Sequence, residues 1–456
     1  MQVYVETYGC QMNEYDSELV RSILRQNRFE VVATPETADV VLLNTCAIRE
    51  HAHQKVFGRV RVLGQLRRRN PDLRIGILGC MAQSLKDDLL RQGSGVDLVA
   101  GPDAYKRLPS LIRQVVETGI PGKEIDLSEY ETYSDVYPER VPGVNAWIAC
   151  MRGCDNFCTF CVVPYTRGRE RSRSPESVVE ETQRLAAQGY KQVTLLGQNV
   201  NSYGADGVDF AELLLRVADV PGIERVRFTS PHPKDFPRPL LAAIATHPKI
   251  CKQIHLPLQA GSDRILERMR RTYTKQEFLD LVDEIRGTIP GVCLSTDLIA
   301  GFPTETQGEF EETVEVVERV GFDSAFIFKY SERKNTIAQR KYPDDVPEAV
   351  KSDRVVLLNE IQKAISIERN RAWIGRTVQV LFEGPSRKSE DDLLGRDDGN
   401  HGVVVPRGRL RPGDLVAVEI VGASAHTLLG RQAGPDGAPS RSPGAPQAAT
   451  IRPSWA

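Results

Sequence analysis

Three cysteines lie close together near the middle of the chain. Cys154, Cys158 and Cys161 form a Cys-x3-Cys-x2-Cys run. Three thiolates cannot complete a tetrahedral zinc site without a fourth ligand from elsewhere in the chain. A 4Fe-4S cluster, by contrast, can be held through three of its irons, which leaves the fourth iron free to bind a small molecule. The spacing therefore predicts such a cluster in preference to a zinc site or ordinary buried thiols.

An iron with a free coordination position indicates what the chemistry could be. The amino and carboxylate groups of S-adenosylmethionine can chelate such an iron, and electron transfer into the sulfonium then breaks a carbon–sulfur bond. The product is a 5′-deoxyadenosyl radical. Phe160 stands directly before the last cysteine, where its ring can lie against the adenine of this cofactor.

Three further cysteines are isolated in sequence but share a local context. Cys10, Cys46 and Cys80 each follow a strand-like run, and two of them follow Gly. A single cysteine of this kind is more often a small buried hydrophobe. The carboxyl ends of parallel strands converge at one edge of a sheet, however, so three cysteines in equivalent places can meet. They favour a second 4Fe-4S cluster with an open iron.

The other cysteines of the chain carry no such pattern. The total is nine, an odd number, so a disulfide framework is not expected. We expect the remaining ones to be ordinary buried thiols: Cys150, Cys251 and Cys293.

The elements that must position these cysteines follow from an alternation of apolar runs and helical stretches. Over residues 1–118 this alternation predicts a parallel α/β domain, before a looser acidic stretch at 123–136. Its expected strands are 3–7, 40–44, 74–78 and 98–100. Residues 140–372 contain six more strand candidates with helices between them, which predicts a (βα)6 partial barrel with its chemistry at the strand carboxyl ends. Its expected strands are 146–149, 192–197, 225–229, 253–258, 292–299 and 324–330.

The C-terminal part has a different pattern. A helix over about 347–373 is followed by short β-type runs at 376–382, 401–405 and 414–421, separated by Gly, Pro and Asp. These runs predict a small all-β barrel over residues 373–432. Residues 433–456 are dominated by Gly, Pro, Ala and Ser, and we expect this tail to be disordered.

Length and charge agree with a multidomain protein. The chain has 456 residues, 41 % hydrophobic and 26 % charged, which excludes disordered and collagenous classes for its bulk. Neither a signal peptide nor an apolar run long enough to span a membrane is apparent, so a cytoplasmic location is expected. The net charge of −2 provides no global basic field. Arginine clusters at 59–74, 167–173 and 264–271 could face phosphates, although a solvated helix face is the commoner explanation.

The central cysteine run and the barrel pattern resemble the radical S-adenosylmethionine superfamily. The whole of residues 1–432 resembles its methylthiotransferase family, in particular the branch that acts on isopentenylated adenosine in tRNA. The motifs that carry this resemblance are TYGCQMN at 7–13, NTCAIRE at 44–50, CTFCVVPYTRG at 158–168 and GQNVNSYG at 197–204.

The resemblance implies two 4Fe-4S clusters, S-adenosylmethionine, and transfer of a methylthio group to carbon 2 of N6-isopentenyladenosine beside the anticodon. It also implies that the C-terminal barrel is a TRAM domain associated with RNA binding. The partner would be tRNA and the enzyme a monomer, with its reductant and sulfur donor unidentified. Residues implied to contact the cofactor, besides Phe160, are Gln198, Asn199, Ile299 and Gly301.

Alternatives within the family are transfer to threonylcarbamoyl-adenosine or to a ribosomal-protein aspartate. An alternative outside it is a non-enzymatic iron–sulfur protein that binds RNA or transfers electrons. Such a protein would have no use for Phe160 or for six barrel units.

A few positions depart from the family pattern. Ala260 stands where Ser is usual, Thr304 where Gly is usual, and Lys334-Asn335 where Pro-Gly is usual. Asn335 is expected to affect its loop most, because Asn adopts a positive φ less readily than Gly.

Overall fold

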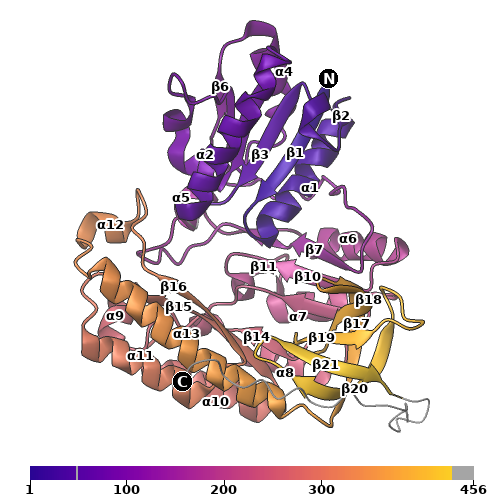
Figure 1. Cartoon of the computed structure of the whole chain (residues 1–456), viewed down its shortest axis with the longest axis vertical. Coiled ribbons are helices and arrows are strands. Elements are labelled where there is room, and N and C mark those ends of the chain that lie inside the picture. Colours follow the sequence, from indigo (N-terminus) through magenta and orange to yellow (C-terminus); the bar gives the residue numbers. More distant parts are fainter. Residues whose placement is uncertain (48–49, 434–456) are drawn as a thin grey trace, which may run out of the picture. The chain divides into compact units, whose positions relative to one another are not determined.

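The computed structural model describes residues 1–47 and 50–433. The predicted disordered tail lies outside these residues, apart from Ala433. The chain divides into two compact units, Met1–Ser366 and Ile367–Ala456. The first contains the α/β sheet and the partial barrel, and the second contains the small β barrel (Figure 1).

The N-terminal sheet is fully parallel and has six strands in the order β2-β1-β3-β4-β5-β6. The four predicted strands are β1 (Gln2–Tyr8), β3 (Val40–Thr45), β4 (Arg74–Gly79) and β5 (Leu98–Ala100). Two edge strands were not predicted, β2 (Glu30–Val31) and β6 (Gly122–Glu124), because they are short and lack an apolar run. The start of the expected loose acidic stretch therefore belongs to the sheet.

Four α-helices of the described chain pack on this sheet, and two of them begin at the strand ends near the cysteines. They are α1 (Gln11–Gln26), α2 (Glu50–Gly64), α3 (Cys80–Leu85) and α4 (Leu108–Thr118). Every residue of β3 is buried, as expected for a central parallel strand with both faces covered. α1 and α3 begin directly at the carboxyl ends of β1 and β4, so both helices start where the cysteines lie.

Six parallel strands form the partial barrel, as predicted. They pair as two three-stranded sheets, with the orders β13-β10-β7 and β14-β15-β16. An isolated parallel β-bridge joins Val226, on β13, to Ile250, which stands just before β14. The strands are β7 (Asn145–Ala149), β10 (Gln192–Leu196), β13 (Arg225–Phe228), β14 (Gln253–His255), β15 (Cys293–Ala300) and β16 (Ser324–Lys329). The helices that follow them are α6 (Pro175–Ala187), α7 (Phe210–Ala218), α8 (Arg238–Thr246), α10 (Lys275–Thr288), α11 (Gln307–Val320) and α13 (Glu348–Arg371).

Local capping explains where several of these helices start. Ser174 is the N-cap of α6 and accepts a hydrogen bond from the backbone N–H of Ser177. Thr274 and Glu277 form a reciprocal capping box on α10. α11 begins with the same arrangement. These signals lie within four residues of each other, so the sequence alone specifies them.

The C-terminal barrel is closed, with the strand order β17-β18-β19-β21-β20. Its strands are β17 (Thr377–Ser386), β18 (Ser389–Arg396), β19 (Gly402–Pro406), β20 (Leu415–Ala423) and β21 (Thr427–Gln432). The sequence missed β18 and β21. The charged side chains that hid β18 are exposed at Glu390 and Asp391, while Leu393 on the same strand is fully buried.

Two departures from the family pattern adopt left-handed backbone conformations. Thr304 and Asn335 each have φ near +72°. The expectation that Asn335 matters most is wrong, because a β-branched residue tolerates positive φ less well than Asn. Thr304 is held by Arg268, whose Nη1 donates to its hydroxyl at 2.7 Å, and by Asp345, which accepts from its backbone N–H at 2.6 Å.

Candidate functional site

The first cysteine triad lies at the carboxyl edge of three adjacent strands. β1, β3 and β4 are in register so that Tyr8 pairs with Thr45, and Thr45 pairs with Gly79. The chain leaves each strand within two residues of a cysteine. The residues concerned are Cys10 at the N-cap of α1, Cys46 after β3, and Cys80 as the first residue of α3.

Two glycines let these strand ends approach each other. A Cβ on Gly9 would lie 2.7 Å from the Cβ of Cys46, and a Cβ on Gly79 would lie 2.7 Å from the carbonyl oxygen of Thr45. Gly79 also has φ +83°, which L side chains rarely adopt. Glycine before Cys10 and Cys80 is therefore required for the edge to close around the three thiols.

The thiols of this triad interact electrostatically. A hydrogen bond with Cys46 lowers the pKa of Cys10 to about 6, against the opposing effect of burial. Burial raises the pKa of Cys80, and the charge of Arg167 opposes that shift. A cluster ligand must be a thiolate, and the depressed pKa of Cys10 favours that form.

Buried asparagines hold this edge together. Asn13 donates from Nδ2 to the carbonyl oxygen of Thr45 at 3.2 Å, and its Oδ1 lies 3.4 Å from the Sγ of Cys10. Asn44 donates to the backbone carbonyl of Asn13 at 2.9 Å. These positioning roles were missed in the sequence analysis, although both residues stand within the motifs quoted there.

The second triad lies on the loop between β8 (Met151–Arg152) and the short helix α5 (Val163–Thr166). Burial raises the pKa of Cys154 to about 11 and that of Cys161 to about 12. Arg271 is buried and its Nη1 lies 3.4 Å from the Sγ of Cys158. Thr159 anchors the loop to the barrel, since its hydroxyl donates to the carbonyl oxygen of Arg268 at 2.8 Å.

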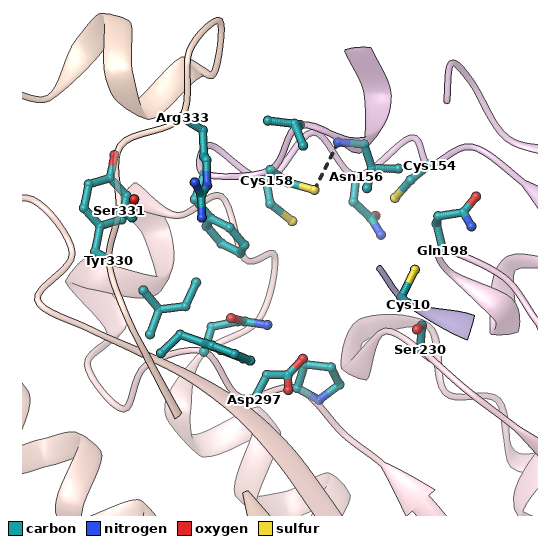
Figure 2. Close-up of a pocket in the computed structure, with 18 of the residues that line it drawn as sticks. Cys10, Cys154, Asn156, Cys158, Gln198, Ser230, Asp297, Tyr330, Ser331 and Arg333 are labelled. Carbon is teal, nitrogen blue, oxygen red and sulfur yellow. Dashed lines mark hydrogen bonds between the residues drawn. The ribbon is translucent and has the colours of Figure 1, made fainter. Parts of the chain in front are cut away.

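A cavity of about 1050 Å³ is lined by cysteines of both triads. Figure 2 shows Cys10 and Cys154 on the same side of this cavity as Gln198, with Tyr330 and Arg333 on the other side. The cysteines that line it are Cys10, Cys154, Cys158 and Cys161. One thiol of the first triad and all three thiols of the second therefore border the same cavity.

The structure separates the residues implied to contact the cofactor into two groups. Phe160, Gln198 and Ile299 line the cavity. Asn199 is only 2 % exposed and its Nδ2 donates to Glu170 at 3.1 Å, away from the cavity lining. A Cβ on Gly301 would lie 2.4 Å from the Cγ of the Lys351 side chain. Asn199 and Gly301 are thus not among the residues that line the cavity.

Polar strand-end residues that the sequence analysis did not single out also line the cavity. The Nε2 of His255, at the end of β14, lies 3.2 Å from Oδ2 of Asp297 on β15. Burial lowers the pKa of His232, another lining residue, to about 3, so this imidazole is neutral. Their position at the carboxyl ends of barrel strands was the signal that could have identified them.

Three of the four arginines at 167–173 are buried in ion pairs and do not face phosphates, whereas Arg169 is exposed and pairs with Asp155. Arg171 is buried and pairs with Asp103 at 2.7 Å, and Arg173 pairs with Glu181 at 2.6 Å. Arg167 is buried against Asp16. The other clusters are also partly ion-paired in the described chain, as the pairs Arg59–Glu6 and Arg264–Glu309 illustrate. Sequence proximity of arginines therefore overstated the free positive surface.

The donor sets fit iron–sulfur clusters. Each triad offers three thiols, and the cavity beside them can receive a ligand for an iron that no cysteine occupies.

A search of the described helices for a membrane-spanning segment, one both long and apolar, finds none.

Comparisons with known proteins give the same division of the chain. Residues 2–101 match the family described as uncharacterized protein family UPF0004, residues 148–317 match the Radical SAM superfamily, and residues 371–432 match the TRAM domain. Among solved structures, the radical S-adenosylmethionine methyltransferase TsrM from Kitasatospora setae is similar in fold. Its TM-score is 0.54 at 17 % identity, over 72 % of each chain.

Curated relatives match over nearly the whole length. The tRNA-2-methylthio-N6-dimethylallyladenosine synthase of Bacteroides fragilis is 47 % identical over 94 % of this chain and 95 % of its own. The synthases of that name from Amoebophilus asiaticus and Prosthecochloris aestuarii are 48 % and 46 % identical, covering 92 % and 98 % of their own lengths. The chain is thus a radical S-adenosylmethionine enzyme with 4Fe-4S chemistry, and it belongs to the tRNA-2-methylthio-N6-dimethylallyladenosine synthase family.

Proposed function

We propose that the chain transfers a methylthio group to carbon 2 of N6-isopentenyladenosine beside the anticodon of tRNA. The observation that carries this proposal is the cavity shared by Cys10 of one triad and by all three cysteines of the other. When bound, the two clusters and S-adenosylmethionine supply a carbon-centred radical, sulfur and a methyl group. An adenine C–H bond is unactivated, so it needs chemistry of this kind.

The residue assignments are part of the same proposal. Cys154, Cys158 and Cys161 hold the cluster that binds S-adenosylmethionine, and the first triad, Cys10, Cys46 and Cys80, holds the cluster that carries sulfur. Phe160, Gln198 and Ile299 contact the cofactor from the cavity wall. Asn199 and Gly301 act indirectly, since neither lines the cavity.

Gln198 has a second role in this proposal. Its Oε1 accepts a hydrogen bond from the backbone N–H of Gly153 at 2.6 Å. Gly153 directly precedes Cys154, so Gln198 ties the barrel strand end to the loop that carries the second triad. This contact orients the loop and the cofactor together.

The size of the cavity supports two ligands. Pockets for one small molecule usually measure about 300–1,000 Å³. The cavity of about 1050 Å³ lies just above this range, as expected for a cofactor and a nucleobase side by side. Aromatic and cationic side chains opposite the cysteines, Tyr330 and Arg333, are suited to a base and its phosphate.

Three parts divide the work in this proposal. Residues 1–118 carry sulfur, residues 140–372 generate the radical, and residues 373–432 contact tRNA. The enzyme acts as a monomer in the cytoplasm, where tRNA is available. Family membership supports this substrate over threonylcarbamoyl-adenosine or a ribosomal protein, and an enzyme over a non-catalytic iron–sulfur protein.

The test is anaerobic reconstitution with iron, sulfide, S-adenosylmethionine, a reductant and isopentenylated tRNA. Mass analysis of nucleosides should show methylthiolated isopentenyladenosine at the expense of its precursor. The same tRNA without the isopentenyl group is the control and should give no product. Product from threonylcarbamoyl-adenosine tRNA alone would contradict the substrate assignment.

Deletion of residues 374–456 should weaken tRNA binding and spare cleavage of S-adenosylmethionine. The barrel exposes basic side chains that can displace counterions from tRNA phosphates. They include Arg387, Lys388, Arg407, Arg409 and Arg411. Loss of about two phosphate contacts should reduce the slope of log Kd against log salt concentration by about 1.4 to 1.8.

The measurement is titration of labelled tRNA at two or more salt concentrations. Deletion of residues 434–456 alone is the matched control, and it should leave affinity and slope unchanged. Equal affinities and equal slopes for the full chain and the longer deletion would show that the barrel does not bind tRNA.

A further inference from the structure

A buried charge cluster lies beside the first cysteine triad. Asp16 on α1 is fully buried, and its two carboxylate oxygens accept hydrogen bonds from two different arginines. Nη2 of Arg152 lies 2.6 Å from Oδ1, and Nη2 of Arg167 lies 2.8 Å from Oδ2. The hydroxyl of Tyr105 adds a contact at 3.3 Å. Both arginine side chains are at most 4 % exposed.

The charges of Asp16, Arg152 and Arg167 do not cancel. Two guanidinium groups face one carboxylate, and the other buried arginines of the same segment have acids of their own: Arg171 with Asp103, and Arg173 with Glu181. Burial of a net positive charge is costly unless an anion compensates it. The Asp16 carboxylate therefore balances only one of the two guanidinium charges that it binds.

Unused hydrogen-bond donors accompany this excess charge. Nη1 of Arg167 is buried and has no hydrogen-bond partner in the described part of the chain. Nη1 and Nε of Arg152 are in the same situation. An arginine can hold a carboxylate with one edge of its planar fork and donate to a second acceptor with another. The geometry thus leaves a place for an anionic acceptor beside Arg167.

Two thiols of the first triad, Cys80 and Cys10, are close enough to Arg167 to interact with its charge. Arg167 is also within hydrogen-bonding reach of Cys80. Arg167 directly follows α5, which packs against α3, whose first residue is Cys80. Val162, the residue after Cys161, shares a buried apolar cluster with Cys80. The segment that follows the second cysteine triad therefore places Arg167 beside the first triad.

We propose that Arg167, held in place by Asp16, is the counter-charge and hydrogen-bond donor of the iron–sulfur cluster on Cys10, Cys46 and Cys80. This inference rests on the proposed assignment of those cysteines. A cluster held by thiolates is an anion, and charge and hydrogen bonds at its sulfurs set its reduction potential. Arg167 favours the reduced, more negative state, and so raises the potential of the sulfur-carrying site. Asp16 is the positioning residue, because it holds Arg167 and acts on the cluster through it.

The test measures a potential rather than turnover. In a full-length background with Cys154, Cys158 and Cys161 replaced by Ala, only the first triad can hold a cluster. Iron content and an EPR-monitored redox titration are recorded for this parent and its variants. Arg167→Met should shift the midpoint potential to a more negative value. Asp16→Asn leaves the positive charge less balanced and should shift the midpoint in the opposite direction.

The matched control is Arg173→Met, because Arg173 is equally buried and ion-paired, and its guanidinium group donates to Glu181, to the hydroxyl of Tyr15 and to the carbonyl oxygen of Ala149. It should leave the midpoint unchanged. Arg167→Met with full iron and an unchanged midpoint would overturn the proposal. If Arg167→Met loses its iron, Arg167→Lys decides the matter. Iron retained with Lys supports the role of the charge, and iron lost from both variants contradicts it.

The result also separates this inference from the assignment of the triad. A parent that binds no iron would refute the cluster on Cys10, Cys46 and Cys80 itself. A parent that binds about four irons, with midpoints insensitive to Arg167 and Asp16, would refute only the role of Arg167.

Discussion

Reductive cleavage of S-adenosylmethionine is lost when Cys154, Cys158 and Cys161 are replaced together by Ala. The expected iron content falls from about eight to about four per chain after full reconstitution, because one of two clusters has no ligands left. The three thiols lie on one loop at the cavity wall, and no other cysteine of the described chain besides Cys10 lines that cavity. Rescue of the cluster by a neighbouring thiol is therefore not expected.

The measurements are iron analysis and quantitation of 5′-deoxyadenosine under reducing conditions. Cys150→Ala is the matched control, since Cys150 is a buried thiol that does not line the cavity; its Sγ donates to the carbonyl oxygen of Leu196 at 3.4 Å. It should retain iron and cleavage. Cleavage that persists in the triple variant would refute the assignment of the radical site.

Replacement of Cys10, Cys46 and Cys80 together by Ala should have the complementary effect. Production of 5′-deoxyadenosine continues because the other triad is intact, whereas methylthiolated nucleoside is absent because the sulfur-carrying cluster has no ligands. The iron content again falls to about four per chain. The two triple variants thus separate radical formation from sulfur transfer.

Folding needs its own control in this variant, since Cys46 and Cys80 are each only 6 % exposed. Thermal unfolding of the metal-free proteins should show a modest loss of stability, because each Cys→Ala change removes one buried sulfur. Methylthiolated product at the level of the unmodified enzyme would contradict the sulfur-carrying role. Loss of 5′-deoxyadenosine together with product would contradict the independence of the two sites.

Local signals explain why much of the architecture could be predicted. Barrel strands such as β10 and β15 contain apolar runs that stand out in the sequence, and the capping residues of α6, α10 and α11 lie within a single turn of each helix start. The short edge strand β6 and the acidic strand β18 were missed because pairing with a neighbour, rather than composition, makes them strands. Strand pairing is a nonlocal property that a single segment does not encode.

Within the site, two residues that are adjacent in sequence point in different directions, which the sequence did not predict. Gln198 and Asn199 are adjacent and equally polar, yet only Gln198 lines the cavity, while Asn199 turns to Glu170. The direction of each side chain depends on the backbone after β10, where Asn199 has φ −150° and ψ 72°. Their motif predicted a cofactor contact for both, and the fold distributes the two side chains differently.

Cysteine chemistry was determined by the sequence, because three thiols within one short loop, and three at the ends of parallel strands, restrict the choice of metal group by number and spacing alone. Only the tertiary structure decided that Cys10 opens onto the cavity of the other triad. It alone also decided that Arg167 is buried against Asp16, 151 residues away. The physical reason is that burial and ion pairing depend on which distant segments pack together, whereas ligand type and spacing are properties of the chain itself.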